Sequence, residues 1–370
     1  MKRRKVIGRL SLAGLALAIP SAIFSIHKPD HYMQTLTSTT KNPALPSVPG
    51  AENYKGTPLD QNGNFMNEEF PFWPNTRDVI KWKLIDTNPY KDQKANSAAR
   101  LQVITHSSMD LVSDNAIIWL GHASFLIHLS GIRILIDPVL GEPGFFLKRF
   151  SALPFDESEF KNIDYILISH NHRDHCDKDS IKLLAKLNPN ATWLCGLGLD
   201  ELLLKEWTGS QNIQAAGWYQ QYQFSRDALN ISFLPTHHWS RRGLSDTNKS
   251  LWGAFMIESQ SKKIYFGGDS GYGSHFKKVP ELFGEVDYYL AGIGAFAPRW
   301  FMAPSHMHPE EAAQACVEIL PKKILPMHFG TFDLSDEPLL EPLLLMKELR
   351  EKNVFKCELV MPVVGEVFKV

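Results

Sequence analysis

The sequence has no excess of charge, few cysteines and no long hydrophobic run. Its 370 residues include 39 Lys plus Arg and 40 Asp plus Glu, and this balance excludes a global field that would favour nucleic acid or an acidic partner. The four cysteines form no C-x-x-C pair and have no regular spacing. Their even number permits disulfides, but small buried residues are the favoured interpretation. The length is ample for a buried core in one large domain or two small ones.

The apolar stretch near the N-terminus, Leu10 to Phe24, is shorter than the ~20 residues of a comfortable membrane span. The basic run Lys2-Arg3-Arg4-Lys5 precedes it, so residues 1–25 are predicted to be an export signal or an N-terminal anchor. Arg3-Arg4 resembles a twin-arginine signal, the route for proteins exported already folded. Ala16-Leu17-Ala18 offers an early cleavage site, and an uncleaved amphipathic anchor is the alternative. Either reading predicts the cell envelope, periplasmic or membrane-anchored, over the cytoplasm.

Residues 26–75 are rich in Pro, Asn, Thr and Ser, with little periodicity, and are predicted to form an extended arm before a domain over residues 76–370. Short apolar runs that end at Gly, Asp or His predict strands in this domain. The expected strands are 117–120, 124–129, 132–136, 165–168, 231–234, 264–266, 288–291 and 323–326. The expected helices between them are 179–187, 200–207 and 309–320. Strands interleaved with helices indicate a layered α/β domain.

The segment 169–175, Ser-His-Asn-His-Arg-Asp-His, follows one of these strands directly. Its four ligand-type side chains are His170, His172, Asp174 and His175. They cannot all be buried without a partner, since unpaired polar burial costs a few kcal/mol each, and a metal would satisfy them. Imidazole and carboxylate ligands suit zinc, and a site open to water suits catalysis. Alone, the run is also compatible with a solvated polar loop.

Three more candidate ligands weaken that alternative, because each follows a predicted strand. They are His238, Asp269 and His328. His237 is the neighbour of His238, and adjacent side chains on an extended segment point apart, so only one of the two can reach a metal.

The run H-x-H-x-D-H with a later His, Asp and His is similar to the metal signature of the metallo-β-lactamase superfamily, over about residues 115–335. This resemblance implies an α/β αββα sandwich, two β-sheets between helices, with two zinc ions per chain at one edge. It assigns His170, His172 and His238 to one metal, Asp174, His175 and His328 to the other, and Asp269 to a bridge. His172 favours zinc, since iron-using branches commonly carry glutamate there.

The chain further resembles the branch of N-acyl-phosphatidylethanolamine-hydrolysing phospholipase D and its bacterial relatives. The matching stretches are 119–124, 168–172, 238–242, 248–253, 268–272, 298–302 and 328–332. The related pattern Pro-x-x-His-Trp fits Pro235, His238 and Trp239, and so favours His238 as the ligand. Where relatives show Tyr-Glu-Pro-Arg, this chain has Phe-Ala-Pro-Arg at 296–299. That departure puts the identity of the substrate in question.

The resemblance implies a phospholipid substrate, met in the membrane or at its surface. In two-metal chemistry, hydroxide attacks the phosphodiester phosphorus and the N-acylethanolamine alkoxide leaves, giving phosphatidic acid. The residues expected to be catalytic are Asp174, Asp269 and His306. His306 would orient the substrate or transfer a proton, and a hydrogen-bonded loop histidine is the alternative.

Two further residues are candidate substrate contacts. Arg299 would contact the phosphate, with an exposed salt bridge as the alternative. Trp300 would line an acyl groove or touch a bilayer, with core packing as the alternative. Asp137 and His122 are expected to orient metal ligands.

Two other functions compete with this prediction. The first is a hydrolase of the same fold that acts on lactones, cyclic phosphates or other small esters. The second is a non-catalytic metal-binding or regulatory protein of the envelope, against which the complete seven-ligand set argues.

Overall fold

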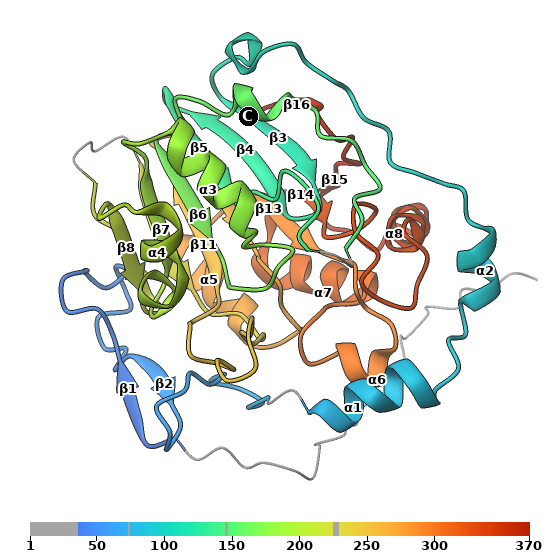
Figure 1. Ribbon diagram of the computed structural model, residues 1–370, viewed down its shortest axis with the longest axis horizontal. Coiled ribbons are helices and arrows are strands. Elements are labelled where there is room, and N and C mark those ends of the chain that lie inside the picture. The colour runs from blue at the N-terminus through green and yellow to red at the C-terminus, as the bar shows by residue number, and fades with distance from the viewer. Residues whose placement is uncertain (1–35, 73–74, 145–146, 225–228) are drawn as a thin grey trace, which may run out of the picture. The chain divides into compact units, whose positions relative to one another are not determined.

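Two mixed β-sheets of seven strands each form the centre of the protein in the computed structural model (Figure 1). The structure describes residues 36–72, 75–144, 147–224 and 229–370. The first sheet has the order β16 (Val367–Lys369), β3 (Ala116–Gly121), β4 (Ser124–Leu129), β5 (Ile132–Ile136), β6 (Tyr165–Ile168), β7 (Thr192–Gly196), β8 (Ile213–Ala216). The second has the order β15 (Glu358–Leu359), β14 (Pro321–Met327), β13 (Val286–Gly292), β12 (Lys263–Phe266), β11 (Ala254–Glu258), β10 (Asn230–Leu234), β9 (Gln220–Gln221).

The two sheets share a plan in which an antiparallel half adjoins a parallel half. In the first sheet, β16 to β5 are antiparallel and β5 to β8 are parallel. In the second, β9 to β12 are antiparallel and β12 to β15 are parallel. The β4–β5 hairpin turns at Ser130 and Gly131, whose φ angles of 56° and 71° are those of a type I′ turn.

Helices cover the outer face of each sheet. Ile118 and Leu120 of β3 pack in one buried cluster with Ile181 of α3 (Lys178–Leu187) on the outside of the first sheet. On the second sheet, Phe276 of α5 (His275–Phe283) lies 6.2 Å from the Tyr289 ring of β13. The helices α7 (Pro309–Ile319) and α8 (Glu341–Glu351) bury side chains in the same cluster as Phe276 and Tyr289.

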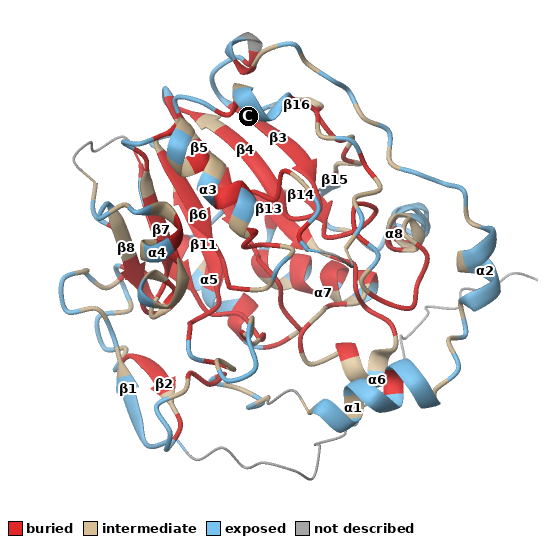
Figure 2. Ribbon diagram, viewed as in Figure 1, coloured by how far each residue is buried: buried red, intermediate tan, exposed pale blue. Residues whose placement is uncertain are grey.

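The main core lies between the sheets, where Figure 2 shows the strands almost wholly buried. Phe125 of β4 faces Phe266 of β12 across this core, with ring centroids 6.2 Å apart. Along β3, Ile117 and Trp119 face this core while their neighbours face the outer helices, because successive side chains of a strand alternate. The predicted αββα sandwich is therefore confirmed.

The described part of the N-terminal arm packs on the domain. Its strands β1 (Ser38–Thr40) and β2 (Thr57–Leu59) pair with each other. Val48 and Phe65 are buried, and their backbone N–H groups donate to the carbonyls of Tyr219 and Asn248. The predicted export signal or anchor of residues 1–25 lies outside the described residues, and among those that are described no helix is long and apolar enough to cross a membrane.

The remaining helical segments are short. They are α1 (Thr76–Ile80), η1 (Lys81–Ile85), α2 (Lys91–Asn96), η2 (Met109–Leu111), η3 (Glu157–Glu159), η4 (Asp200–Leu204), α4 (Lys205–Thr208) and α6 (Arg299–Met302). The first two are continuous and lie beside α6 (Figure 1), where the Trp82 ring packs on the Phe301 ring at 5.0 Å.

Candidate metal centre

The seven residues predicted as metal ligands follow the carboxyl ends of four strands. Four of them follow β6 in the first sheet, and the other three follow β10, β12 and β14 in the second. The last three strands run in one direction, because β12 and β14 are parallel to β13 and β10 is antiparallel to β11, itself antiparallel to β12. Their ends therefore lie at one edge of the sandwich, the position that α/β sheets favour for a site.

Asp269 lies at the centre of this edge. Its Oδ2 is 3.0 Å from His328 Nε2 and 3.1 Å from His175 Nε2. The same oxygen is 3.9 Å from His170 Nε2 and 3.8 Å from His238 Nε2. One carboxylate oxygen thus lies between two sets of imidazole nitrogens, which is where a ligand shared by two metals would lie.

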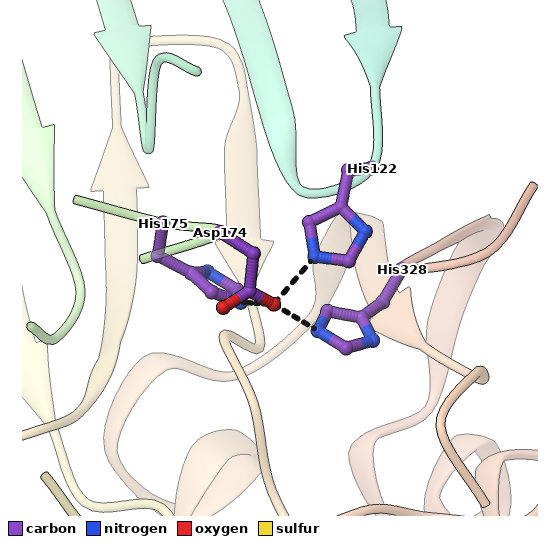
Figure 3. A group of neighbouring side chains, drawn as sticks. All are labelled: His122, Asp174, His175 and His328. Carbon is purple, nitrogen blue, oxygen red and sulfur yellow. Dashed lines mark hydrogen bonds and ion pairs between the residues drawn. The ribbon is translucent and has the colours of Figure 1, made fainter. Parts of the chain in front are cut away.

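The first set contains Asp174, His175 and His328 together with His122. Asp174 Oδ2 is 2.9 Å from His122 Nε2 and 3.5 Å from the Nε2 atoms of both other histidines. Figure 3 shows these side chains converging from the β3–β4 turn, the segment after β6 and the end of β14. One ligand atom from each of the four lies within 4.8 Å of the others, so the group has the dimensions of a metal site.

The second set contains His170, His172 and His238. His172 Nδ1 is 2.9 Å from His170 Nε2 and 3.1 Å from His238 Nε2. His238 Nδ1 donates to the carbonyl of Ser305 at 3.1 Å. That bond fixes the ring, so Nε2 of His238 is the nitrogen that faces the site.

Asp137 supports the centre from behind. Its Oδ2 accepts hydrogen bonds from His175 Nδ1 at 2.8 Å and from Ser169 Oγ at 2.6 Å, and its Oδ1 accepts from Ser169 N at 2.7 Å. The Asp137 carboxylate therefore orients His175 so that Nε2 points at Asp269. A carboxylate behind a histidine is the usual support of a metal-binding imidazole.

The backbone is strained at three positions of the centre. His122, Asp137 and His328 have φ angles of 51°, 42° and 67°, in the left-handed region that residues with side chains avoid. Each such residue costs about 1–3 kcal/mol, and such residues cluster at functional sites. Gly294 lets the backbone pass close to His328, since a Cβ there would lie 1.9 Å from the His328 carbonyl oxygen.

Burial keeps the second set of histidines neutral. Burial, reinforced by neighbouring imidazoles, lowers the pKa of His170 and His238 well below the usual value. It likewise lowers the pKa of His172 to about 4. Neutral imidazole is the form that binds a metal, so this set is ready for one.

Two histidines of the first set, His175 and His328, carry protons that a metal would replace. Burial alone would lower the pKa of His175 and His328, but the carboxylates of Asp269 and Asp174 outweigh it. The pKa of His175 is raised well above the usual value, and that of His328 to about 9. Nε2 of each ring forms an ion pair with Asp269 Oδ2, at 3.1 Å for His175 and 3.0 Å for His328, whereas Asp269 Oδ1 is buried with no hydrogen-bond partner among the described residues. Once the two rings lose these protons, their Nε2 lone pairs and Asp269 Oδ1 are the acceptors that a divalent cation needs.

His306 and Arg299 lie next to this centre. His306 Nδ1 is 3.8 Å from Asp269 Oδ2, and burial lowers the pKa of His306 to about 3, so its ring is neutral at physiological pH. Arg299 Nη1 donates to the carbonyl of His306 at 2.9 Å, and its Nη2 pairs with both carboxylate oxygens of Glu311 at 2.9 and 2.8 Å. The structure thus shows an ion pair at Arg299, and its phosphate contact stays a prediction.

The structure separates the two adjacent histidines. His238 joins the second set, whereas His237 Nε2 lies 3.6 Å from Glu69 Oε2 and its ring packs 4.6 Å from that of His275. His308 is the N-cap of α7: its Nδ1 accepts from Glu310 N at 3.3 Å, and its own N–H donates to Glu311 at 2.8 Å. His308 therefore has a structural account, as one half of a capping box.

Sequence reasoning missed Asn67, which holds a predicted ligand in place. Asn67, on the N-terminal arm and almost fully buried, donates from Nδ2 to the carbonyl of His238 at 3.0 Å. Its Oδ1 accepts from His238 N at 3.3 Å and from Trp252 Nε1 at 3.1 Å. Asn67 lies in a stretch without periodicity, where the sequence shows only an uncharged polar residue after the apolar Phe65 and Met66.

Comparison with known proteins agrees with this fold and centre. The family model described as a β-lactamase superfamily domain matches residues 132–329. The chain is 31% identical to N-acyl-phosphatidylethanolamine-hydrolyzing phospholipase D 1 of Caenorhabditis elegans, over 79% of this chain and 88% of that protein. It is 32% identical to the mitochondrial N-acyl-phosphatidylethanolamine-hydrolyzing phospholipase D of Saccharomyces cerevisiae, over 67% of this chain and 54% of that protein.

Solved structures show the same fold at lower identity. Isothiocyanate hydrolase from Delia radicum gut bacteria has a TM-score of 0.56 and 19% identity, covering 69% of this chain and 99% of that one. The fold and the buried His and Asp groups define a metal-dependent hydrolase of the metallo-β-lactamase fold, with a centre suited to two metals. The chain belongs to the β-lactamase superfamily, and the N-acyl-phosphatidylethanolamine-hydrolysing phospholipases D are its homologues.

Proposed function

We propose that this protein is a binuclear zinc phosphodiesterase that hydrolyses N-acyl-phosphatidylethanolamine-type phospholipids to N-acylethanolamine and phosphatidic acid. The observation that carries the proposal is the position of Asp269 Oδ2 between the two histidine sets. The activity printed in the names of the two phospholipase relatives supports the choice of substrate.

The ligand assignment follows from the two sets. His170, His172 and His238 would hold one zinc, Asp174, His175 and His328 the other, and Asp269 would bridge them. When bound, two zinc ions lower the pKa of a shared water and neutralise charge on the phosphate oxygens. Histidine at position 172, where iron-using relatives commonly carry glutamate, favours zinc.

The neutral ring of His306 suits the orienting role better than the acid role. A ring with a pKa of about 3 is neutral at pH 7, so it is not the imidazolium that would act as the acid, but its one N–H can donate a hydrogen bond to a phosphate oxygen. Arg299 positions His306 through the carbonyl bond, and Glu311 holds that guanidinium in place. Trp300 lies exposed on α6, where it can contact the acyl chains.

The bond that breaks is the P–O bond on the ethanolamine side. Water adds its oxygen to phosphorus, and the electron pair of the broken bond goes to the N-acylethanolamine oxygen. That oxygen takes up one proton of the water, and the other stays on the new phosphate oxygen. Phosphatidic acid keeps the new oxygen. The substrate is a bilayer lipid, and the proposed site of action is the cell envelope, reached through residues 1–25.

A panel of phospholipids, assayed by mass spectrometry with the zinc-loaded protein, tests the proposal. The expected result is N-acylethanolamine and phosphatidic acid from N-acyl-phosphatidylethanolamine, with turnover rising above the lipid's aggregation point. Asp269→Asn is expected to abolish most turnover while the protein stays folded. Brisk hydrolysis of a lactone, cyclic phosphate or other small ester, with no phospholipid turnover, would instead support the small-ester hydrolase. Bound metal with no hydrolysis of any of these substrates would support the non-catalytic envelope protein.

A further inference from the structure

Two of the four cysteines lie together at one edge of the second sheet. Cys316 is in the last turn of α7, shortly before β14 begins at Pro321, and Cys357 directly precedes β15. The edge strand β15 pairs in parallel with β14, with Glu358 opposite Lys323 (Figure 1). Cys316 and Cys357 therefore both lie at the amino-terminal ends of these neighbouring strands.

The two thiols contact each other. All four cysteines are free thiols in the structure, but those of Cys316 and Cys357 share a hydrogen bond, and both residues pack in the cluster that joins α7 to the second sheet. Cys316 is 1% exposed, whereas Cys357 is half-buried between the exposed Lys356 and Glu358. A molecule in solution can therefore reach the Cys357 thiol, whereas the Cys316 thiol is reached only through Cys357.

The shared hydrogen bond makes Cys357 the more reactive thiol of the two. It lowers the pKa of Cys357, and together with burial it raises the pKa of Cys316 well above the usual value. The thiolate is the nucleophile in disulfide exchange, so Cys357 is the residue that attacks an oxidant first. Once that thiolate is consumed, the hydrogen bond that held the proton on Cys316 is lost, and Cys316 can attack in turn.

Cys176 and Cys195 differ from this pair. Both are fully buried on the outer side of the first sheet. Burial raises the pKa of Cys176 to about 12 and that of Cys195 well above the usual value. The Cys195 thiol donates to the carbonyl of Gln214 at 3.8 Å. These two cysteines are therefore the small buried residues that the sequence predicts, and they serve as internal controls.

We propose that Cys316 and Cys357 form a disulfide that ties the end of α7 to the edge strand β15. The oxidant is another disulfide, which the proposed location in the cell envelope would supply. The Cys357 thiolate attacks one oxidant sulfur and expels the other as a thiol. Cys316 then attacks Cys357 Sγ, the new S–S bond forms, and the second oxidant sulfur leaves as a thiol. Two electrons and two protons thus pass from the cysteines to the oxidant.

This disulfide would stabilise the fold without acting on the candidate metal centre. It closes a loop over residues 316–357, which contains β14 and α8. A cross-link of this kind stabilises mainly by restricting the unfolded chain, and a long loop gains more than a short one. The strand β14 spans about 20 Å, and the candidate ligand His328 lies beyond its far end. The inference is therefore independent of the reaction at the centre.

Peptide mapping of the purified full chain tests the proposal. The protein is incubated with oxidised glutathione, its free thiols are alkylated in denaturant, and the unreduced peptides are analysed by mass spectrometry. The expected product is one linked pair of peptides that joins Cys316 to Cys357, with Cys176 and Cys195 alkylated. Alkylation of all four cysteines, a link between any other two, or glutathione retained on Cys357 would overturn the proposal.

Two serine variants test the order of the steps. Cys316→Ser lacks the thiol that attacks second, so it is expected to retain one glutathione on Cys357. Cys357→Ser keeps only the buried thiol of the pair and is expected to take up no glutathione. Glutathione on Cys316 of the second variant, or none on Cys357 of the first, would overturn Cys357 as the residue that attacks first.

Thermal unfolding measures the stabilising effect. The oxidised wild type is expected to unfold at a midpoint at least about 5 °C above that of the reduced protein. Cys357→Ser is expected to have the same midpoint after either treatment, near that of the reduced wild type. Metal content is expected to be equal in the oxidised and reduced wild type. Equal midpoints for the two forms of the wild type would overturn the stabilising role.

Discussion

The Asn67 side chain forms two hydrogen bonds with the backbone of His238: it donates to the carbonyl at 3.0 Å and accepts from the N–H at 3.3 Å. An arm residue therefore fixes the loop that carries a candidate ligand of the domain. A substitution of Asn67 would leave the buried N–H and carbonyl of His238 without hydrogen-bond partners. Both the stability of the protein and its affinity for metal are therefore expected to fall.

Asn67→Ala is accordingly predicted to destabilise the protein by about 1–3 kcal/mol. It should also weaken binding of the metal held by His170, His172 and His238 by about 10–100-fold, the usual effect of removing a group that supports a ligand. Denaturation and competition with a metal chelator measure the two effects. Asn62→Ala, at an exposed position in the preceding turn of the arm, is the control, and equal metal affinities in the two variants would contradict this role of Asn67.

The two adjacent histidines are predicted to behave differently. His238→Ala should remove the metal of the second set and the activity, because its Nε2 faces His172 and Asp269. His237→Ala should leave metal content near that of the wild type, because its ring faces Glu69 and His275. Metal analysis of both purified variants is the test. The reverse pattern would show that the ligand has been placed one residue too late.

Metal uptake is predicted to release protons. Without metal, the carboxylates of Asp269 and Asp174 raise the pKa of His328 to about 9 against the effect of burial, so its ring is protonated at pH 7. A metal binds the neutral ring, so apparent affinity should rise as the pH rises toward 9 and fall at lower pH. Calorimetry in buffers of different ionisation enthalpy counts the released protons. Affinity that does not change between pH 7 and about 9 would contradict this account.

Export is predicted to depend on the arginine pair. Replacing Arg3 and Arg4 with lysine keeps the charge but removes the twin-arginine pattern, so the protein should stay in the cytoplasm. Lys2→Arg/Lys5→Arg is the control and should be delivered normally. Fractionation of the cells measures both. Delivery of the Arg3→Lys/Arg4→Lys variant to the envelope would exclude the twin-arginine route. The remaining explanations would be a general secretory signal or an anchor.

Much of the sheet structure could be predicted because its signals are local. Strands β4, β5 and β6 have the predicted bounds, since each is an apolar run closed by a turn, an acid or the H-x-H-x-D-H segment. The helix α5 was missed because Pro280 interrupts it and no side chain caps its start. The helix α8 and the strand β11 were missed as well.

The grouping of the candidate ligands was predictable for the same reason, and the residues around them were not. Each ligand follows a strand, so the order of strands brings them to one edge. Asn67 acts across 171 positions of sequence, and the partner of Arg299 is set by the packing of α6 against α7. Such contacts depend on tertiary structure, for which a single sequence carries no periodic signal.

The direct test of the central claim is hydrolysis of N-acyl-phosphatidylethanolamine in water labelled with oxygen-18, with the zinc-loaded protein. Mass spectrometry is predicted to find the label in phosphatidic acid and none in N-acylethanolamine, because water attacks phosphorus and the ethanolamine-side P–O bond breaks. Diacylglycerol among the products would mean that the glyceride-side bond is cut. Label in N-acylethanolamine, or no turnover of the lipid at all, would contradict the account.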